Sequence, residues 1–540
     1  MQTSRLSKTE LFAQAPIPRA LAAMGIPTII SQLINLIYNM VDAFFIGRTG
    51  NSYMMAATTV TLTLTMLNVA FANLYGVGGG SLIARLMGQK REAEGRQVSA
   101  YAVRGAILLG LGYALTTGLF RAPILRFLGA SDATLGFAEQ YTLYVIVVGS
   151  TPTILSLTLA HLLRNTGYSS QASFGLSMGG VLNMALDPLF MFVLLPRGRE
   201  VTGAAAATLI SNLAACGYLL LAYRRAGRGR AAALSGRRLI RHRATVRRPM
   251  PPSPQWEGTD RNGLMREGEA AALSRRHLIR PSVRTGAPSP QGEGFGGEGC
   301  APLTLDLRQA GGLAREHKRS LYAVGVPSAV LTGLFDLASV CVNKLAAAHD
   351  DLVLAAFGIV MKVERIPNAV NIGICQGMMP IVAYNYAAGN RERMQAAVRT
   401  ARLCGLAVSA LSIALLELFA RPVTNLFLST SAGDAAGALT TVGFAAAFLR
   451  VRCLAAPVQL INYHSSFSLQ AIGNGRDTML HACVRELGVY IPLMYLLDRL
   501  FGEMGLASAL PAAEGLAALF ALWLLRRALN QEQSVRDEWK

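Results

Sequence analysis

Two carboxylates lie inside long apolar stretches of this sequence. Asp42 belongs to the stretch YNMVDAFFIGR, and Asp187 belongs to the stretch NMALDPLFMF. Asn183 precedes Asp187 by four residues, which places the two side chains on one face of a helix. Pro188 follows directly and can bend the helix there, because it lacks a backbone N–H. Charged groups in apolar helices are costly and are therefore candidates for function.

Two buried carboxylates in one part of a chain are suited to binding a cation. Such a pair can hold a proton, or a sodium ion shared with neutral oxygens, and can release it when the site opens to water. The sequence therefore predicts a cation site at Asp42, Asn183 and Asp187, in which the candidate metal ion is sodium. A structural interpretation stays open, in which Asp42 orients a helix end and Asp187 marks a turn at Pro188.

The elements that must position these residues are membrane-spanning helices. Of the 540 residues, 52% are hydrophobic and only 15% are charged, whereas soluble proteins carry about 25% charged residues. Apolar stretches of about 20 residues recur along the chain, and the bilayer interior favours helices for them. We predict an all-α integral membrane protein with twelve transmembrane helices. The expected spans lie near residues 20–46, 54–83, 98–120, 137–160, 173–195, 203–223, 321–345, 352–384, 395–420, 440–470, 479–500 and 504–528.

The sequence repeats itself after 300 residues. GIPTIISQLINLIYNM begins at Gly25 and GVPSAVLTGLFDLASV begins at Gly325, and two further pairs of segments recur at nearly the same shift. We therefore expect two six-helix halves, residues 1–225 and 313–540, related by a pseudo-twofold axis along the membrane normal. Paired halves around a central cavity are typical of transporters that work by alternating access.

The two halves differ in their charged residues. The repeat counterpart of Asp42 is Val342, and no carboxylate pair of the second half matches that of the first. Lys362, Glu364 and Arg365 stand close together in the sequence MKVERIPN, for which we predict an internal salt-bridge cluster. The predicted cation site therefore belongs to the first half alone.

A central segment, residues 226–312, differs from its surroundings. It is rich in Arg, Pro, Gly and Ser and contains an internal repeat, and such a composition cannot bury a core. We predict a disordered basic insertion, and a tether for anionic lipids or a partner is the alternative. Residues 224–319 hold 20 basic and 8 acidic residues, which accounts for +12 of the formal net charge of +20. This charge therefore does not indicate nucleic-acid binding.

The remaining basic residues indicate an orientation. Outside the central segment, 18 Lys and Arg flank the spans on the side of the two termini and 8 flank them on the other side. Positive residues accumulate on the cytoplasmic side of membrane proteins. We therefore expect both termini in the cytoplasm.

Several stretches resemble the multidrug and toxic compound extrusion (MATE) family, in particular its bacterial MepA-like and DinF-like branches. They are YNMVDAFFIGR, GVGGGSLIARLMGQKREAE, NMALDPLFMF, GAAAATLIS, QGMMPIVAYNYAAGNRERM and FSLQAIGNGR. The resemblance covers residues of about 15–225 and 315–528 and omits only the central segment. The stretches QGMMPIVAYNY and NMALDP carry it most specifically.

The resemblance implies a function and a fuller site. Members of the family are cation-coupled antiporters, which expel small organic, often cationic drugs across the bacterial inner membrane against a proton or sodium gradient. It implies no cofactor, no nucleic-acid partner and a monomer in the lipid bilayer. The site residues implied by the matching motifs are Asp42, Asn183, Asp187 and Thr208, with weaker matches at Asn35 and at Tyr141, for which Tyr144 is an alternative.

Other classes of protein remain to be weighed. A flippase for lipid-linked oligosaccharides within the same superfamily is the nearest alternative, but its cavity would be cationic, whereas this half carries carboxylates. A membrane-embedded enzyme would need a nucleophile–base or metal constellation within the spans, such as an HExxH-like spacing or a GxSxG turn, and no such constellation survives inspection of the sequence. The seven cysteines show no metal-binding spacing. A receptor without transport activity is the third alternative.

Overall fold

The computed structural model describes residues 8–49, 52–196, 198–246, 302–425 and 435–537. Every regular element within these ranges is a helix. Residues 1–230 and 300–540 form one compact unit, and residues 231–299 form a second. All of the candidate site residues belong to the first unit.

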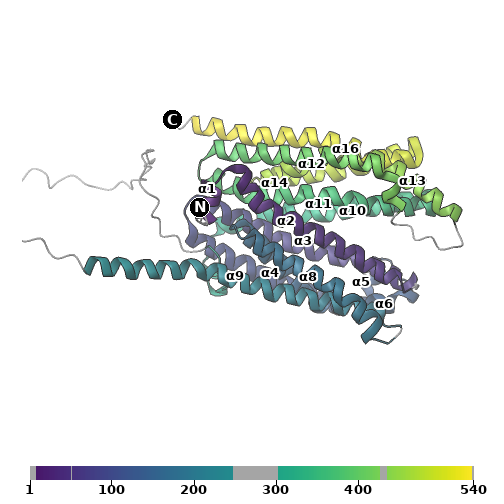
Figure 1. Cartoon of the computed structure of the whole chain (residues 1–540), viewed down its shortest axis with the longest axis horizontal. Coiled ribbons are helices and arrows are strands. Elements are labelled where there is room, and N and C mark those ends of the chain that lie inside the picture. The colour runs from purple at the N-terminus through teal and green to yellow at the C-terminus, as the bar shows by residue number, and fades with distance from the viewer. Residues whose placement is uncertain (1–7, 50–51, 197, 247–301, 426–434, 538–540) are drawn as a thin grey trace, which may run out of the picture. The chain divides into compact units, whose positions relative to one another are not determined.

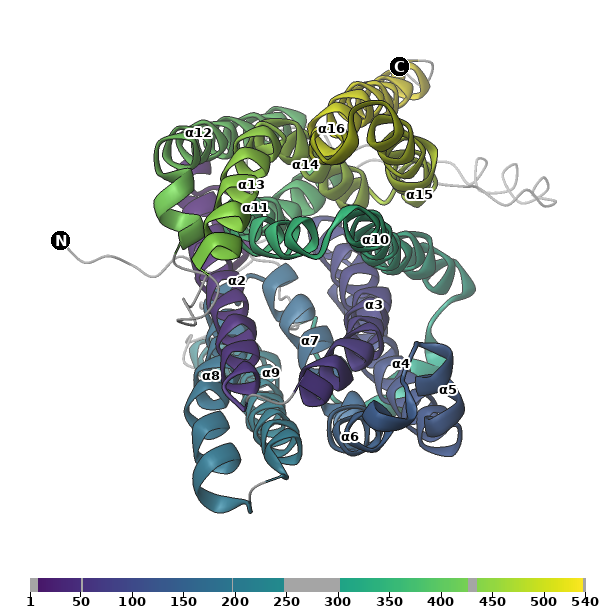
Figure 2. The same ribbon diagram turned by 90° about the vertical axis from the view of Figure 1, so that its right-hand side faces the viewer.

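The helices fall into two groups that follow the two halves of the sequence. The first half contains α1 (Lys8–Ala13), α2 (Ile17–Gly47), α3 (Ser52–Gly88), α4 (Glu92–Leu119), α5 (Arg121–Phe127), α6 (Asp132–Thr142), the π-helix η1 (Leu143–Val148), α7 (Ser150–Asn165), α8 (Ser169–Pro188), the π-helix η2 (Leu189–Leu194) and α9 (Glu200–Val246). The second half contains the 3-10 helix η3 (Leu307–Gly312), α10 (Arg315–His349), α11 (Asp351–Ala387), α12 (Arg391–Asn425), α13 (Ala435–Cys453), α14 (Ala456–Ile472), α15 (Gly475–Cys483), the π-helix η4 (Val484–Tyr490) and α16 (Ile491–Asp537). Viewed end-on, α2 to α9 and α10 to α16 occupy separate regions (Figure 2).

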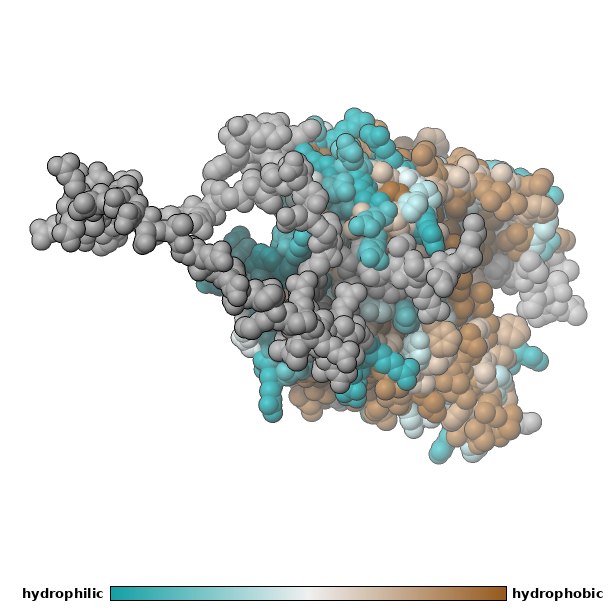
Figure 3. Space-filling model, turned by 60° about the vertical axis from the view of Figure 1, so that its left-hand side comes forward, coloured by the Kyte–Doolittle hydropathy of each residue, from teal (hydrophilic) through white to brown (hydrophobic). Residues whose placement is uncertain are grey.

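The predicted twelve spans are confirmed. Among the described residues, eight helices are long and apolar enough to cross a membrane, and two bent pairs raise the number to ten. One of the eight, residues 475–530, breaks at Gly502, whose φ is 61°, and gives two antiparallel spans. The helix α11, which is 37 residues long, is the twelfth span. Hydrophobic side chains cover most of the face shown in Figure 3, and hydrophilic ones gather toward one end of it.

Matching irregularities in the two halves agree with the predicted pseudo-twofold relation. The fourth span of each half is a bent pair, α6–η1 with α7 and α13 with α14, and both bends measure 49°. Each pair is followed by a glycine in the left-handed region, Gly167 with φ 89° and Gly473 with φ 87°. The most extensive contacts between the halves are α3 with α10 and α2 with α11, and the pseudo-twofold operation exchanges these two pairs.

Glycines allow the halves to approach closely. A Cβ atom at Gly325 of α10 would collide with the backbone oxygen of Leu74 in α3, and one at Gly78 of α3 would collide with the backbone oxygen of Leu321 in α10. Small residues at helix interfaces let backbones meet in this way and are typical of membrane helices. The largest buried core runs through this interface and draws on both halves.

Both edges of the predicted central segment, residues 226–312, contain described structure. At the start, α9 continues as a helix to Val246. At the other end, Leu303 and Leu313 are buried, and the backbone N–H of Thr304 donates to Ser99 Oγ of α4 at 3.0 Å. Leucines spaced along PLTLDLRQAGGL supply the apolar contacts that the surrounding composition lacks. The rest of the segment, residues 247–301, lies outside the described residues.

Replacing Gly325 with valine tests the close contact between α3 and α10. We expect Gly325→Val to lower stability by about 1–3 kcal/mol, because the added side chain forces the two backbones apart. Gly333→Val is the matched control, since a Cβ at Gly333 of the same helix meets nothing within 4 Å. Thermal unfolding of the detergent-solubilised protein measures both. Equal melting temperatures for the two variants would contradict the close contact.

Candidate functional site

Asn183 links two helices through hydrogen bonds to two candidate residues. Its Nδ2 atom donates to Asp187 Oδ1 one turn further along α8, at 3.2 Å. The same atom also lies 3.2 Å from Thr208 Oγ1 of α9. Asn183 is 3% exposed and Asp187 is fully buried. The helical spacing of Asn183 and Asp187 therefore produces the shared face that the sequence predicted.

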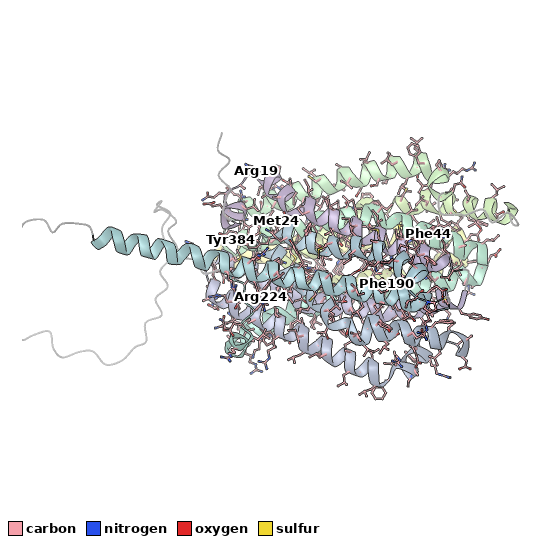
Figure 4. The ribbon with its side chains drawn as sticks, turned by 60° about the horizontal axis from the view of Figure 1, so that its bottom comes forward. Arg19, Met24, Phe44, Phe190, Arg224 and Tyr384 are labelled. Carbon is pink, nitrogen blue, oxygen red and sulfur yellow. The ribbon has the colours of Figure 1, made fainter. Side chains whose placement is uncertain are left out.

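Asp42 and Tyr141 bring two further helices to the same place. Asp42 lies on α2, which packs extensively against α8, and its carboxylate interacts electrostatically with that of Asp187. The hydroxyl of Tyr141, in the last turn of α6, lies near the Thr208 side chain and interacts electrostatically with both carboxylates. Figure 4 shows Phe44 and Phe190, which follow Asp42 and Asp187 closely in sequence, toward the same end of the helices.

Three oxygen atoms of this cluster have no hydrogen-bond partner within the described residues. They are Asp42 Oδ1, Asn183 Oδ1 and Asp187 Oδ2, and all three are buried. Burying a polar atom without a partner costs about 1–3 kcal/mol, and more when the group carries a charge. Two carboxylate oxygens and one amide oxygen are hard ligands of the type that hard cations prefer. The donor set therefore fits a proton on a carboxylate or a sodium ion.

Irregular helix geometry surrounds the cluster. The α-helical hydrogen-bonding pattern of α8 ends at Pro188, directly after Asp187, and continues as the π-helix η2. Tyr141 likewise lies just before the π-helix η1. Pro188 therefore stands where the helix type changes, and the bend predicted there stays a prediction. π-Helical turns are rare and are frequent at functional sites.

Not every predicted residue joins the cluster. Asn35 of α2 is exposed, and its backbone carbonyl accepts a hydrogen bond from Asn39 Nδ2 at 2.6 Å. Of the two alternatives in α6 and η1, Tyr141 contacts the cluster, and Tyr144 packs at the edge of an apolar core. The sequence analysis also missed Tyr38, whose hydroxyl interacts with both carboxylates. Its position four residues before Asp42 was the available signal.

The second half contains a separate buried polar network. Arg485 of η4 contacts both side-chain oxygens of Glu514 in α16, at 2.5 and 3.1 Å, and lies 3.6 Å from Glu486. Asn462 Nδ2 donates to Glu514 at 2.6 Å. The sequence analysis missed this network, and therefore missed two buried carboxylates. It differs from the first cluster because an arginine is bound to its carboxylates.

The salt bridge predicted within MKVERIPN is also placed differently. Glu364 of α11 binds both Arg452 Nε and Arg452 Nη2 of α13, each at 2.8 Å, rather than a residue of its own segment. This pair joins two spans of the second half. Among the described residues, no group of three or more His, Cys, Asp and Glu residues could hold a metal ion.

Comparisons with known proteins agree with this architecture. The MatE family model matches residues 27–189 and 327–496. The multidrug export protein MepA of Staphylococcus saprophyticus is 24% identical over 526 residues, and the match covers 97% of each chain. MepA of Staphylococcus aureus strain NCTC 8325 has the same identity and coverage.

Solved structures match over nearly the whole chain. The crystal structure of MATE in complex with MaL6 has a TM-score of 0.77 and 19% identity, covering 98% of this chain and 100% of the other. An outward-facing multidrug resistance MATE family transporter of the MOP superfamily has a TM-score of 0.75 and 20% identity, covering 98% and 99%. These matches show that the fold is shared.

Twelve membrane spans in two related halves, with a polar cluster buried in one half, define a multi-pass membrane protein of transporter architecture. Because the matching family model spans more than half of the sequence and the relatives match end to end, the chain belongs to the MatE family. The resemblance noted in the sequence is thereby confirmed.

A double-mutant cycle tests the hydrogen bond between Asn183 and Asp187. We expect Asn183→Leu to destabilise the protein by about 1–3 kcal/mol, because it deprives the buried Asp187 carboxylate of its amide donor. In an Asp187→Asn background the same change should cost much less, since no charge is left unpaired. Denaturant unfolding measures both effects.

The control for this cycle pairs Asn183→Leu with Asp132→Asn, which removes an exposed carboxylate distant in sequence and bound to Arg126. These two effects should add within about 0.5 kcal/mol. If the changes in the free energy of unfolding caused by Asn183→Leu and Asp187→Asn also add, the hydrogen bond between these two residues is contradicted.

Proposed function

We propose that the protein exports small organic compounds, mainly organic cations, in exchange for a proton or a sodium ion. The family and the names of the full-length relatives support multidrug export as the general activity. The cluster on α2, α6, α8 and α9 supplies the site at which the two cations compete.

The observation that carries this proposal is the set of three partnerless buried oxygens on Asp42, Asn183 and Asp187. Two carboxylates close together and out of water cannot both remain charged without a counterion. A bound proton or sodium ion neutralises them, and so does an organic cation. Binding of one cation therefore weakens binding of the other, which is the requirement for exchange.

Alternating access connects this competition to transport. The two halves move against each other, so that the cluster faces one side of the membrane and then the other. From the inner side the site takes up the drug and releases the coupling ion, and from the outer side the reverse occurs. Pro188 and η2, next to Asp187, supply a section of helix whose hydrogen bonding can change during this movement.

The lipid-linked oligosaccharide flippase remains the alternative function, and the charges favour export of cations. A pyrophosphate-linked cargo needs free cationic groups in the cavity. In the second half, Arg452 and Arg485 are each bound to a glutamate, Glu364 and Glu514 respectively. Asp42 and Asp187 of the first half have no cationic partner among the described residues. A cationic cargo fits this distribution better.

The cellular setting follows from the same proposal. We place the protein in the bacterial inner membrane as a monomer, with both termini and the central segment in the cytoplasm, because basic residues concentrate on that side. Transport of this kind uses the ion gradient as its energy source and needs no cofactor.

Transport in vesicles tests the role of Asp187. Gradient-driven uptake of ethidium into inverted vesicles should fall at least tenfold in Asp187→Asn, because the amide cannot bind the coupling ion. Asp132→Asn, which removes an exposed carboxylate, should transport like the unchanged protein. Immunoblotting normalises the amount of protein in each vesicle preparation. Undiminished transport by Asp187→Asn would overturn the proposal.

The same vesicles distinguish the coupling ion. A protonophore abolishes proton-coupled transport in sodium-free buffer, and an imposed sodium gradient sustains sodium-coupled transport in the presence of the protonophore. Transport that depends on neither gradient would contradict cation exchange for any ion.

A further inference from the structure

A basic cluster lies at the point where the lipid-facing surface of α4 ends. Arg104 is exposed and stands about 18 Å along the helix from its start at Glu92. After it, exposed leucines follow at helical spacing on the same face of α4. They are Leu108, Leu111, Leu115 and Leu119. The face therefore consists of an apolar stripe with one arginine at its end.

The segment that follows the central insertion adds more positive charge beside Arg104. Arg104, Ile107, Leu108, Leu307 and Arg308 line a groove of about 350 Å³ between α4 and η3. Its walls are apolar and an arginine stands on each of them. The buried Leu303 and Leu313 on either side of η3 hold this segment on the surface of the helices.

A lysine completes the cluster. Lys318 Nζ of α10 lies 5.5 Å from the ring centroid of Tyr101. The hydroxyl of Tyr101 interacts electrostatically with both Lys318 and Arg104. Three cations from α4, η3 and α10 therefore converge, and Tyr101 supplies a polar hydroxyl among them.

No carboxylate neutralises these cations within the described residues. Asp306, the nearest in sequence to Arg308, accepts hydrogen bonds from the Arg308 backbone N–H and the Gln309 side chain at the start of η3. Glu94 of α4 is bound by Arg91 and His317. The cluster therefore keeps an excess of positive charge at the end of an apolar surface.

We propose that the groove between α4 and η3 binds an anionic phospholipid. Its phosphate lies against Arg104 and Arg308, with Lys318 nearby, and an acyl chain lies along the stripe that begins at Leu108. In this arrangement the phosphate pairs with the charge of Arg104, which would otherwise face the lipid phase. The long arginine side chain can reach toward the headgroups. Basic pockets between membrane helices on the cytoplasmic side bind such headgroups. The lipid fixes η3, and thereby the return of the chain from the central insertion.

Binding of phosphatidylglycerol to the purified full-length protein tests this proposal. Native mass spectrometry from micelles that contain phosphatidylglycerol and phosphatidylcholine measures which lipid is retained. We expect preferential retention of phosphatidylglycerol, and a loss of about 30-fold in its affinity in the double variant Arg104→Gln/Arg308→Gln, since each arginine near an anionic lipid contributes about 1 kcal/mol. The double variant Arg199→Gln/Arg421→Gln, which removes two exposed arginines elsewhere in the chain, should retain the lipid unchanged.

Two results would overturn the lipid site. One is equal retention of phosphatidylglycerol by the two double variants, each shown to be folded by size-exclusion chromatography. The other is displacement of the lipid by millimolar inorganic phosphate, which would assign the cluster to a free phosphate ion. Retention that survives phosphate and is lost with the two groove arginines supports the lipid.

Discussion

A carboxylate oxygen buried without a hydrogen-bond donor has to be neutralised, and this constraint governs the first half of the molecule. Asp42 Oδ1 and Asp187 Oδ2 are both in this position, together with the amide oxygen of Asn183. In water these atoms would be hydrated, and in the buried cluster the charge of each carboxylate calls for a proton or a cation. The cluster is therefore stable when occupied, and a change in its occupant changes the energy of the surrounding helices. Such a dependence is what an exchanger requires, because ion and drug have to replace one another.

The helices that position this cluster follow a pattern that is repeated in the two halves of the molecule. Both halves break their fourth span by 49°, and both place a π-helix in their fifth. Among the described residues, Asp42 and Asp187 of the first half have no cationic partner, whereas in the second half Arg485 binds Glu514 and Arg452 binds Glu364. The same fold thus carries an arginine–glutamate network in one half and the proposed cation site in the other. Close packing of α3 and α10 through Gly78 and Gly325 joins the halves. The courses of these two helices can be followed in Figure 1 and Figure 2.

Much of this site could be predicted from the sequence, because charge in an apolar stretch is conspicuous and the spacing of Asn183 and Asp187 is local. Residues brought together by tertiary structure were harder to predict. Arg485 and Glu514 meet only because the chain reverses near Gly502, and Asn35 shares the helical register of Asp42 yet remains exposed. At one edge of the central segment, the average composition concealed the leucines that pack beside η3.

Release of the coupling ion on addition of drug tests the central claim most directly. Purified protein is placed in weakly buffered detergent solution, and a pH indicator, or a sodium-selective electrode in parallel, follows the addition of ethidium. Competition at the cluster predicts release of about one proton or sodium ion per ethidium bound, and little or none from the double variant Asp42→Asn/Asp187→Asn. Ethidium binding without release of either ion, or equal release from the double variant, would contradict the claim that the two carboxylates hold the exchanged cation.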